Sequence, residues 1–108
     1  MSWLLRQGEV LASIEITSSL YERLIGFRPE SLFAATMLRP AVLIQSISCR
    51  SSLDIAFCDH NLVVVSIIFL KKNRICLTKP KTAFVLEAPG GSFERWNLQK
   101  GDCLEIKG

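Results

Sequence analysis

The chain has 108 residues, a mass of 12.1 kDa and a net charge of +3, with 49% hydrophobic and 21% charged residues. This length predicts one domain over residues 1–108, and the composition excludes an intrinsically disordered chain. The charge is too small to indicate a nucleic-acid or membrane-surface partner by itself. A single histidine, His60, excludes any mechanism that needs two imidazoles.

The first 16 residues contain Arg6, Gln7 and Glu9, so they lack the apolar stretch of a signal peptide. The longest apolar run, residues 62–70, is nine residues long, whereas a membrane-spanning helix needs about 20. We therefore expect a cytoplasmic protein without a membrane partner.

Four cysteines are spread along the chain with no C-x-x-C pair among them: Cys49, Cys58, Cys76 and Cys103. In a cytoplasmic protein we expect such cysteines to be reduced and to act as small apolar side chains. Their spacing matches no common zinc motif. We expect no disulfide, no metal ion and no cofactor.

The first half of the chain predicts short elements. Residues 10–17 alternate apolar and polar side chains from Ala12 onwards, which indicates a strand. Ser19 and Glu22 match a capping box, and Gly26 can end the short helix that follows. Residues 37–38 and 42–47 are strand-like and are separated by Arg39-Pro40.

The second half predicts a hairpin and then a single helical turn. Residues 53–58 and 62–70 are rich in β-branched and aromatic side chains, and Asp59-His60-Asn61 between them predicts a three-residue turn. Residues 83–87 form a further predicted strand. Ser92 is the predicted N-cap of a helical turn, and residues 103–107 alternate as a last strand.

Predicted strands outnumber helices, and no strand–long helix–strand unit occurs, which argues against a doubly wound parallel sheet. The sequence predicts a mainly β domain with two short helices. Its architecture is a mostly antiparallel β-sandwich or a partly open barrel.

Two carboxylates interrupt predicted apolar strands. Asp54 lies within 53–58, and Glu87 follows Val85-Leu86. A carboxylate in such a strand needs a partner, and the candidate donors for Asp54 are Arg39, Arg50 and the backbone near Ser51-Ser52. Structural pairing is the favoured interpretation, and a ligand-facing polar cluster is the alternative.

Other polar motifs have structural explanations that we favour. His60 fits an exposed turn residue, and no G-x-S-x-G nucleophile motif accompanies it, so no catalytic residue is identified. Gly90-Gly91-Ser92 can present backbone N–H groups to an anion, but we favour the explanation that the glycines ease entry into a capped turn. A basic stretch without acids or aromatics fits a charged loop that protects a sheet edge, with an anionic partner as the alternative: Lys71, Lys72, Arg74, Lys79 and Lys81.

Several motifs recur in a fixed order: Leu38-Arg39-Pro40, Arg50 followed by Asp54-Ile55-Ala56-Phe57, Val85-Leu86-Glu87-Ala88 with Gly90 or Gly91, and Gly101-Asp102-Cys103-Leu104. This order resembles the DUF192 (UPF0127) family of small bacterial and archaeal proteins over residues 11–106.

The resemblance implies a compact, mainly β domain and no known reaction. Similar members tend to have a histidine at the position of Gln45, a methionine at Cys49 and a proline at Ser52. A family activity that used that histidine would be absent from this chain.

We expect a non-enzymatic binding or interaction module with an unknown protein or small-molecule partner, and nucleic acid is disfavoured. The alternative is a small-molecule-binding or hydrolytic domain. It would use a candidate polar cluster of five residues: Arg39, Gln45, Arg50, Asp54 and Glu87. Residues 62–70 are apolar on both faces, and one domain can cover a single such strand, so we expect a monomer or a weak dimer.

Overall fold

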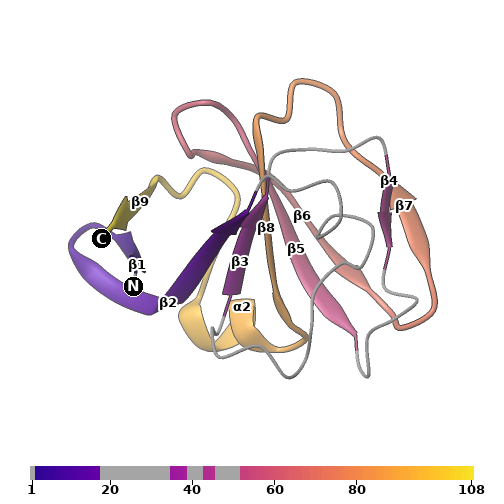
Figure 1. The fold of residues 1–108 in the computed structure, drawn as a ribbon, viewed down its shortest axis with the longest axis horizontal. Coiled ribbons are helices and arrows are strands. Elements are labelled where there is room, and N and C mark those ends of the chain that lie inside the picture. Colours follow the sequence, from indigo (N-terminus) through magenta and orange to yellow (C-terminus); the bar gives the residue numbers. More distant parts are fainter. Residues whose placement is uncertain (1, 18–34, 39–42, 46–51) are drawn as a thin grey trace.

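The computed structural model describes residues 2–17, 35–38, 43–45 and 52–108. The described elements are β1 (Ser2–Arg6), β2 (Glu9–Thr17), β3 (Ala35–Leu38), β4 (Leu43–Gln45), β5 (Leu53–Cys58), β6 (Val64–Leu70), β7 (Ile75–Leu77), β8 (Phe84–Pro89), α2 (Ser92–Trp96) and β9 (Leu104–Lys107). Seven strands form one curved sheet in the order β6-β5-β8-β3-β2-β1-β9, and β4 and β7 form a second sheet (Figure 1). Within these sheets only β2 and β3 are parallel neighbours.

The two edge strands of the large sheet, β6 and β9, meet at one end. Val63 and Cys103 form an antiparallel bridge. Beside it, the Val64 N–H donates to the Asp102 carbonyl at 2.9 Å, and the Leu104 N–H donates to the Leu62 carbonyl at 3.0 Å. The sheet therefore curls back on itself as a partly open barrel. The predicted mainly β, mostly antiparallel fold is confirmed, in its barrel form.

The curved sheet is covered on both faces. Its inner face holds a core to which all seven strands contribute, including Leu4, Ile14, Met37, Leu86 and Leu104. Its outer face holds a second core with side chains from β4, β5, β6 and β8, namely Ile44, Leu53, Ile55, Phe57, Leu70 and Val85. The small β4–β7 sheet covers this outer core. All six residues of β5 are buried because each face of the strand meets one of the two cores.

The hairpin of β5 and β6 is confirmed, with Leu53 opposite Leu70 and Phe57 opposite Ser66. Its connection is longer than predicted, because β6 begins at Val64 and not at residue 62. Asp59 explains the difference: its Oδ1 accepts from the N–H groups of Asn61 at 2.8 Å and Val63 at 3.0 Å. The side chain thereby organises a five-residue turn over 59–63.

β1 was not predicted, although a local signal for it exists. Gln7 and Gly8 join β1 to β2 with φ angles of 51° and 80°. Two consecutive positive φ angles define the tight turn that suits the twist of a two-residue hairpin, and glycine adopts this conformation without strain. The local signal is the pair Gln7-Gly8, which lies between the apolar runs 3–5 and 10–12.

One of the two predicted helices is observed as α2, and the other, over residues 19–26, lies outside the described residues. The predicted N-cap of α2 is wrong. Gly91 with φ 95° is the N-cap, no side chain of its own caps the helix, and Ser92 is the first helical residue. Among the described segments, no helix is long and apolar enough to cross a membrane.

Candidate functional site

Asp54 caps α2 from a strand that lies almost 40 residues earlier in the chain. Its side chain is buried, and its Oδ2 accepts from the N–H groups of Gly91 at 3.0 Å and Phe93 at 2.9 Å. The first N–H groups of a helix have no partner within the helix, and the helix dipole favours a negative charge at this end. The predicted donors were Arg39, Arg50 and the backbone near Ser51-Ser52. The described donors are the backbone N–H groups of Gly91 and Phe93, which were not predicted.

The same contact explains the candidate anion site at Gly90-Gly91-Ser92. The Gly91 amide points to the Asp54 carboxylate, so the anion beside this loop is a side chain of the same chain. Gly91 needs its positive φ, and Gly90 has no room for a Cβ because the Ser52 hydroxyl and the Phe69 ring lie against it. Ser92 is buried, and its Oγ accepts from Arg95 Nη2 at 3.2 Å.

Glu87 lies on the opposite face of the sheet from Asp54. It pairs with Ile55 on β5, whereas Asp54 pairs with Ala88, and side chains alternate along a strand. Glu87 is 1% exposed, and no described residue forms a hydrogen bond with its Oε2. Burial raises the pKa of Glu87 to about 7. Burial also raises the pKa of Cys76 on β7, and the nearby Glu87 contributes to that shift.

The described residues of the candidate polar cluster do not share a site. Asp54 faces the inner core and α2, whereas Glu87 faces the outer core. Gln45 ends β4 opposite Ile75, and only its backbone is described. Arg39 and Arg50 lie outside the described residues.

A shallow cavity of about 420 Å³ opens between β6 and α2. Its walls are mostly apolar, and two carboxylates stand among them. The lining residues are Asp54, Ile67, Ile68, Phe69, Gly91, Phe93 and Glu94. The cavity therefore combines apolar contact area with negative charge.

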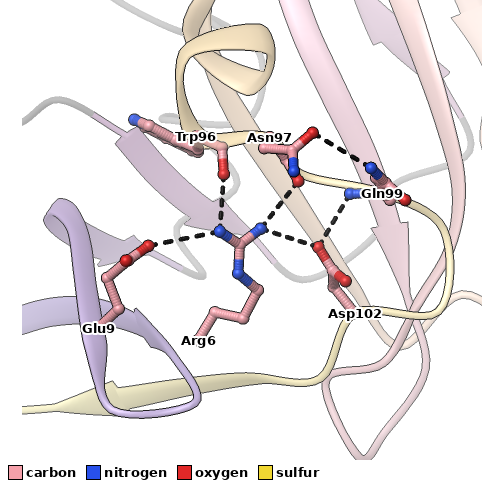
Figure 2. A network of polar contacts seen from close by, with 6 residues as sticks. All are labelled: Arg6, Glu9, Trp96, Asn97, Gln99 and Asp102. Carbon is pink, nitrogen blue, oxygen red and sulfur yellow. Dashed lines mark hydrogen bonds and ion pairs between the residues drawn. The ribbon is translucent and has the colours of Figure 1, made fainter.

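A second polar network, centred on Arg6, was not predicted (Figure 2). Arg6 Nη2 donates to the Trp96 carbonyl at 2.7 Å, and Nη1 donates to the Asn97 carbonyl at 2.9 Å and to Asp102 Oδ2 at 3.0 Å. Arg6 also forms a longer ion pair of 3.4 Å with Glu9. The guanidinium thus joins the end of β1 to the end of α2 and to the turn before β9. Most of its partners lie 90 or more residues away, so no local pattern could reveal them.

The basic stretch flanks β7 along the chain. Ile75 and Leu77 on this strand are 57% and 69% exposed, whereas Cys76 between them belongs to the outer core. Exposed cations precede and follow the strand, namely Lys71, Lys72, Arg74, Lys79 and Lys81. We call these seven exposed residues the β7 surface.

The charge of the chain is concentrated in this segment. Residues 71–81 hold five of the 13 basic residues and none of the 10 acidic residues, so they carry +5. The other 97 residues then carry −2. The net charge of +3 is therefore the sum of a strongly basic segment and a slightly acidic remainder of the chain.

The remaining candidates are His60 and the cysteines. His60 is exposed in the β5–β6 turn, as predicted for a turn residue. Cys58, Cys76 and Cys103 are free thiols, and Cys49 lies outside the described residues. Burial and the nearby Asp59 raise the pKa of Cys58 to about 12, which keeps it a neutral thiol. Across the ranges that the structure describes, no three metal-ligating side chains come together.

The partly open barrel with a short helix beside it occurs in other solved proteins. A protein of unknown function from Novosphingobium aromaticivorans is 17% identical, with a TM-score of 0.74 over 96% of this chain and 82% of its own. A structure described as "a putative transcription regulator" from Sinorhizobium meliloti is also 17% identical, with a TM-score of 0.77 over 97% and 91% of the two chains. At this identity the likeness shows a shared fold.

The amino-acid sequence also identifies the family of the chain. Residues 5–106 match the model of the DUF192 family, an uncharacterized ACR, and the chain belongs to this family. The predicted resemblance is confirmed over nearly the whole chain. No curated protein matches it.

Proposed function

We propose that this protein is a non-enzymatic binding module and that the β7 surface is where its partner binds. One observation carries the proposal: residues 71–81 hold five of the 13 basic residues and no acidic residue, and they flank a strand with two exposed aliphatic side chains, Ile75 and Leu77. A solvated edge that only needs protection would place charged residues on the strand itself. Here the strand is apolar and the charges flank it, which is the arrangement of a binding surface with an apolar centre and a polar rim.

The chemistry of the surface favours an acidic protein segment as the partner. Five cations with no acid among them attract negative charge and speed its association. Nucleic-acid modules combine such charge with aromatic side chains for stacking, and residues 71–81 contain none. Ile75 and Leu77 instead offer contact area to aliphatic side chains of a protein.

The two buried carboxylates support a binding function over a catalytic one. Asp54 already accepts two hydrogen bonds as the cap of α2. Glu87 is closed off from solvent on the other face of the sheet. A hydrolytic pair needs both groups at one substrate, and these two groups have the sheet between them.

The test uses a synthetic peptide with blocked termini, in which Val-Thr-Val is flanked on each side by three glutamates. We expect the fluorescently labelled peptide to bind, and we expect about a tenfold or greater loss of affinity in Lys79→Glu/Lys81→Glu and in Ile75→Ser/Leu77→Ser. The matched control, Lys100→Glu/Lys107→Glu, makes the same charge change at exposed lysines elsewhere. Equal losses in control and test variants would overturn the proposal, as would tighter binding of single-stranded RNA or of anionic lipid vesicles.

A small-molecule site is the second candidate, and the cavity between β6 and α2 favours it. Asp54 and Glu94 at its apolar walls fit an organic cation with an apolar body. Benzylamine is a suitable probe, and Trp96 is a nearby reporter because its ring centroid lies 5.5 Å from that of Phe93 in the cavity wall. A saturable change in Trp96 fluorescence that Glu94→Gln weakens would support this candidate, and an unchanged signal would exclude it for this class of ligand.

A further inference from the structure

We infer that the partner binds in extended form, as a third strand added to the outer edge of β7. The inference rests on the proposed function and specifies how the partner lies on the β7 surface. Strand addition combines backbone hydrogen bonds, which supply affinity, with side-chain contacts, which supply specificity.

No strand of the described part of the chain pairs with the outer edge of β7. The strand with which β7 pairs is β4, through Leu43 with Leu77, Ile44 with Cys76 and Gln45 with Ile75. Among the described residues, no backbone bond from 75–77 reaches any other element. β7 lies at the right-hand margin of the molecule in the view of Figure 1. An edge of this kind presents unpaired N–H and C=O groups to an incoming strand.

The small sheet also gains from a third strand. Two-stranded sheets are marginal on their own, and three strands with an apolar face are far more stable. In β7 the side chain of Cys76 faces the outer core, and Ile75 and Leu77 face outwards. An added strand would continue this alternation, with its own outward side chains beside Ile75 and Leu77.

The flanking charges define the sequence of the partner. β7 has three residues, which span roughly 10 Å. Lys71, Lys72 and Arg74 precede it, and Lys79 and Lys81 follow it. A matching partner is therefore apolar over about three residues and acidic at both ends. The same lysines repel a second copy of this chain at the edge, because two such segments would bring +5 against +5.

The experiment measures amide hydrogen exchange of β7 by NMR, with and without saturating acidic peptide of the composition given above. We expect the β7 amide that points away from β4 to exchange about tenfold more slowly in the complex, because it gains a backbone acceptor. A second peptide carries the same side chains but has N-methyl groups on its central Val-Thr-Val. It keeps the charge and the apolar contacts, cannot donate to β7, and should bind about tenfold or more weakly.

The outcomes test strand addition and the proposed binding function separately. If the N-methylated peptide binds as tightly as the parent and the β7 amides exchange at unchanged rates, the partner docks through side chains alone. The strand-addition inference is then wrong, while the proposed binding module stands. If the unmodified peptide does not bind, both are overturned. Protection of the β7 amide together with loss of binding on N-methylation supports the inference.

Discussion

At the scale of single residues, Asp54 and Glu87 show how environment assigns different roles to similar groups. Both are buried carboxylates on neighbouring strands of one sheet. Asp54 faces the N–H groups at the start of α2, which satisfy a negative charge. Glu87 lies on the face of the outer core, between Ile55 on β5 and Thr36 on β3, and burial raises its pKa to about 7. Asp54 therefore stabilises the fold by capping α2, whereas burial disfavours the ionised form of Glu87.

Asp54→Ala should lower the free energy of unfolding by about 2–3 kcal/mol, because it leaves the Gly91 and Phe93 N–H groups without their charged acceptor. Urea unfolding followed by circular dichroism measures this change. Asp54→Asn keeps one acceptor oxygen and should cost less. Glu94→Gln removes an exposed carboxylate from the same helix and should stay within about 0.5 kcal/mol. A loss below about 0.5 kcal/mol for Asp54→Ala would contradict the capping role and favour a ligand-binding role for the carboxylate.

Glu87 predicts a pH dependence of a defined sign. The pKa of Glu87 rises from the ordinary value of 4.5 to about 7 in the folded chain, so between these values the folded state binds more protons than the unfolded state. The stabilisation that this group provides is complete below about pH 4.5 and is lost as the pH rises through about 7. The loss is on the order of 3 kcal/mol, since one pKa unit corresponds to about 1.4 kcal/mol.

Glu87→Gln isolates this contribution, because the amide has nearly the same shape and does not ionise. The measurement is the difference in unfolding free energy between the parent and the variant from about pH 4.5 to about pH 8. We expect the parent to lose stability relative to the variant as the pH rises. A difference that stays constant over this range would show that Glu87 is not desolvated in the folded state.

At the scale of elements, the sequence predicts a strand well when its pattern is local. The alternation over 10–17 and the paired apolar runs of the β5–β6 hairpin locate β2, β5 and β6. β7 has three residues, too few for a period-two pattern to stand out within a basic stretch. The cap of α2 and the Arg6 network escape prediction for a different reason: their partners come from elements 37 to 96 residues away. Such contacts exist only once the sheet has curled.

Arg6→Ala should destabilise the fold by about 2–3 kcal/mol, because Arg6 is the shared donor to the Trp96 and Asn97 carbonyls and to Asp102. Arg6→Lys should recover only part of this loss, since an ammonium group cannot reproduce the planar fork of a guanidinium group. Urea unfolding is again the measurement. Glu9→Gln serves as the control because the Glu9 side chain is 69% exposed, and its effect should stay within about 0.5 kcal/mol. Equal effects of Arg6→Ala and Glu9→Gln would contradict a structural network.

At the scale of the whole molecule, closure of the large sheet and the positive charge of residues 71–81 both act on strand edges that could otherwise pair with another chain. The Val63–Cys103 bridge joins the two edge strands at one end of the barrel, which removes part of the exposed edge there. In the described part of the chain, β7 pairs along one edge with β4, and the +5 segment contains this strand. A protein with an unprotected apolar edge would associate with itself, so the lysines select against self-pairing while they attract an acidic partner.

This arrangement predicts a monomer or at most a weak dimer at about 10 µM, because two β7 edges repel each other at a distance shorter than the roughly 8 Å screening length of physiological salt. Light scattering coupled to size exclusion should give a mass near 12.1 kDa. Lys79→Glu/Lys81→Glu reduces the charge of the segment from +5 to +1 and should increase self-association, whereas the Lys100→Glu/Lys107→Glu control should not. A stable higher oligomer of the parent chain would show that the β7 charges do not govern its association, as would equal behaviour of the two charge variants.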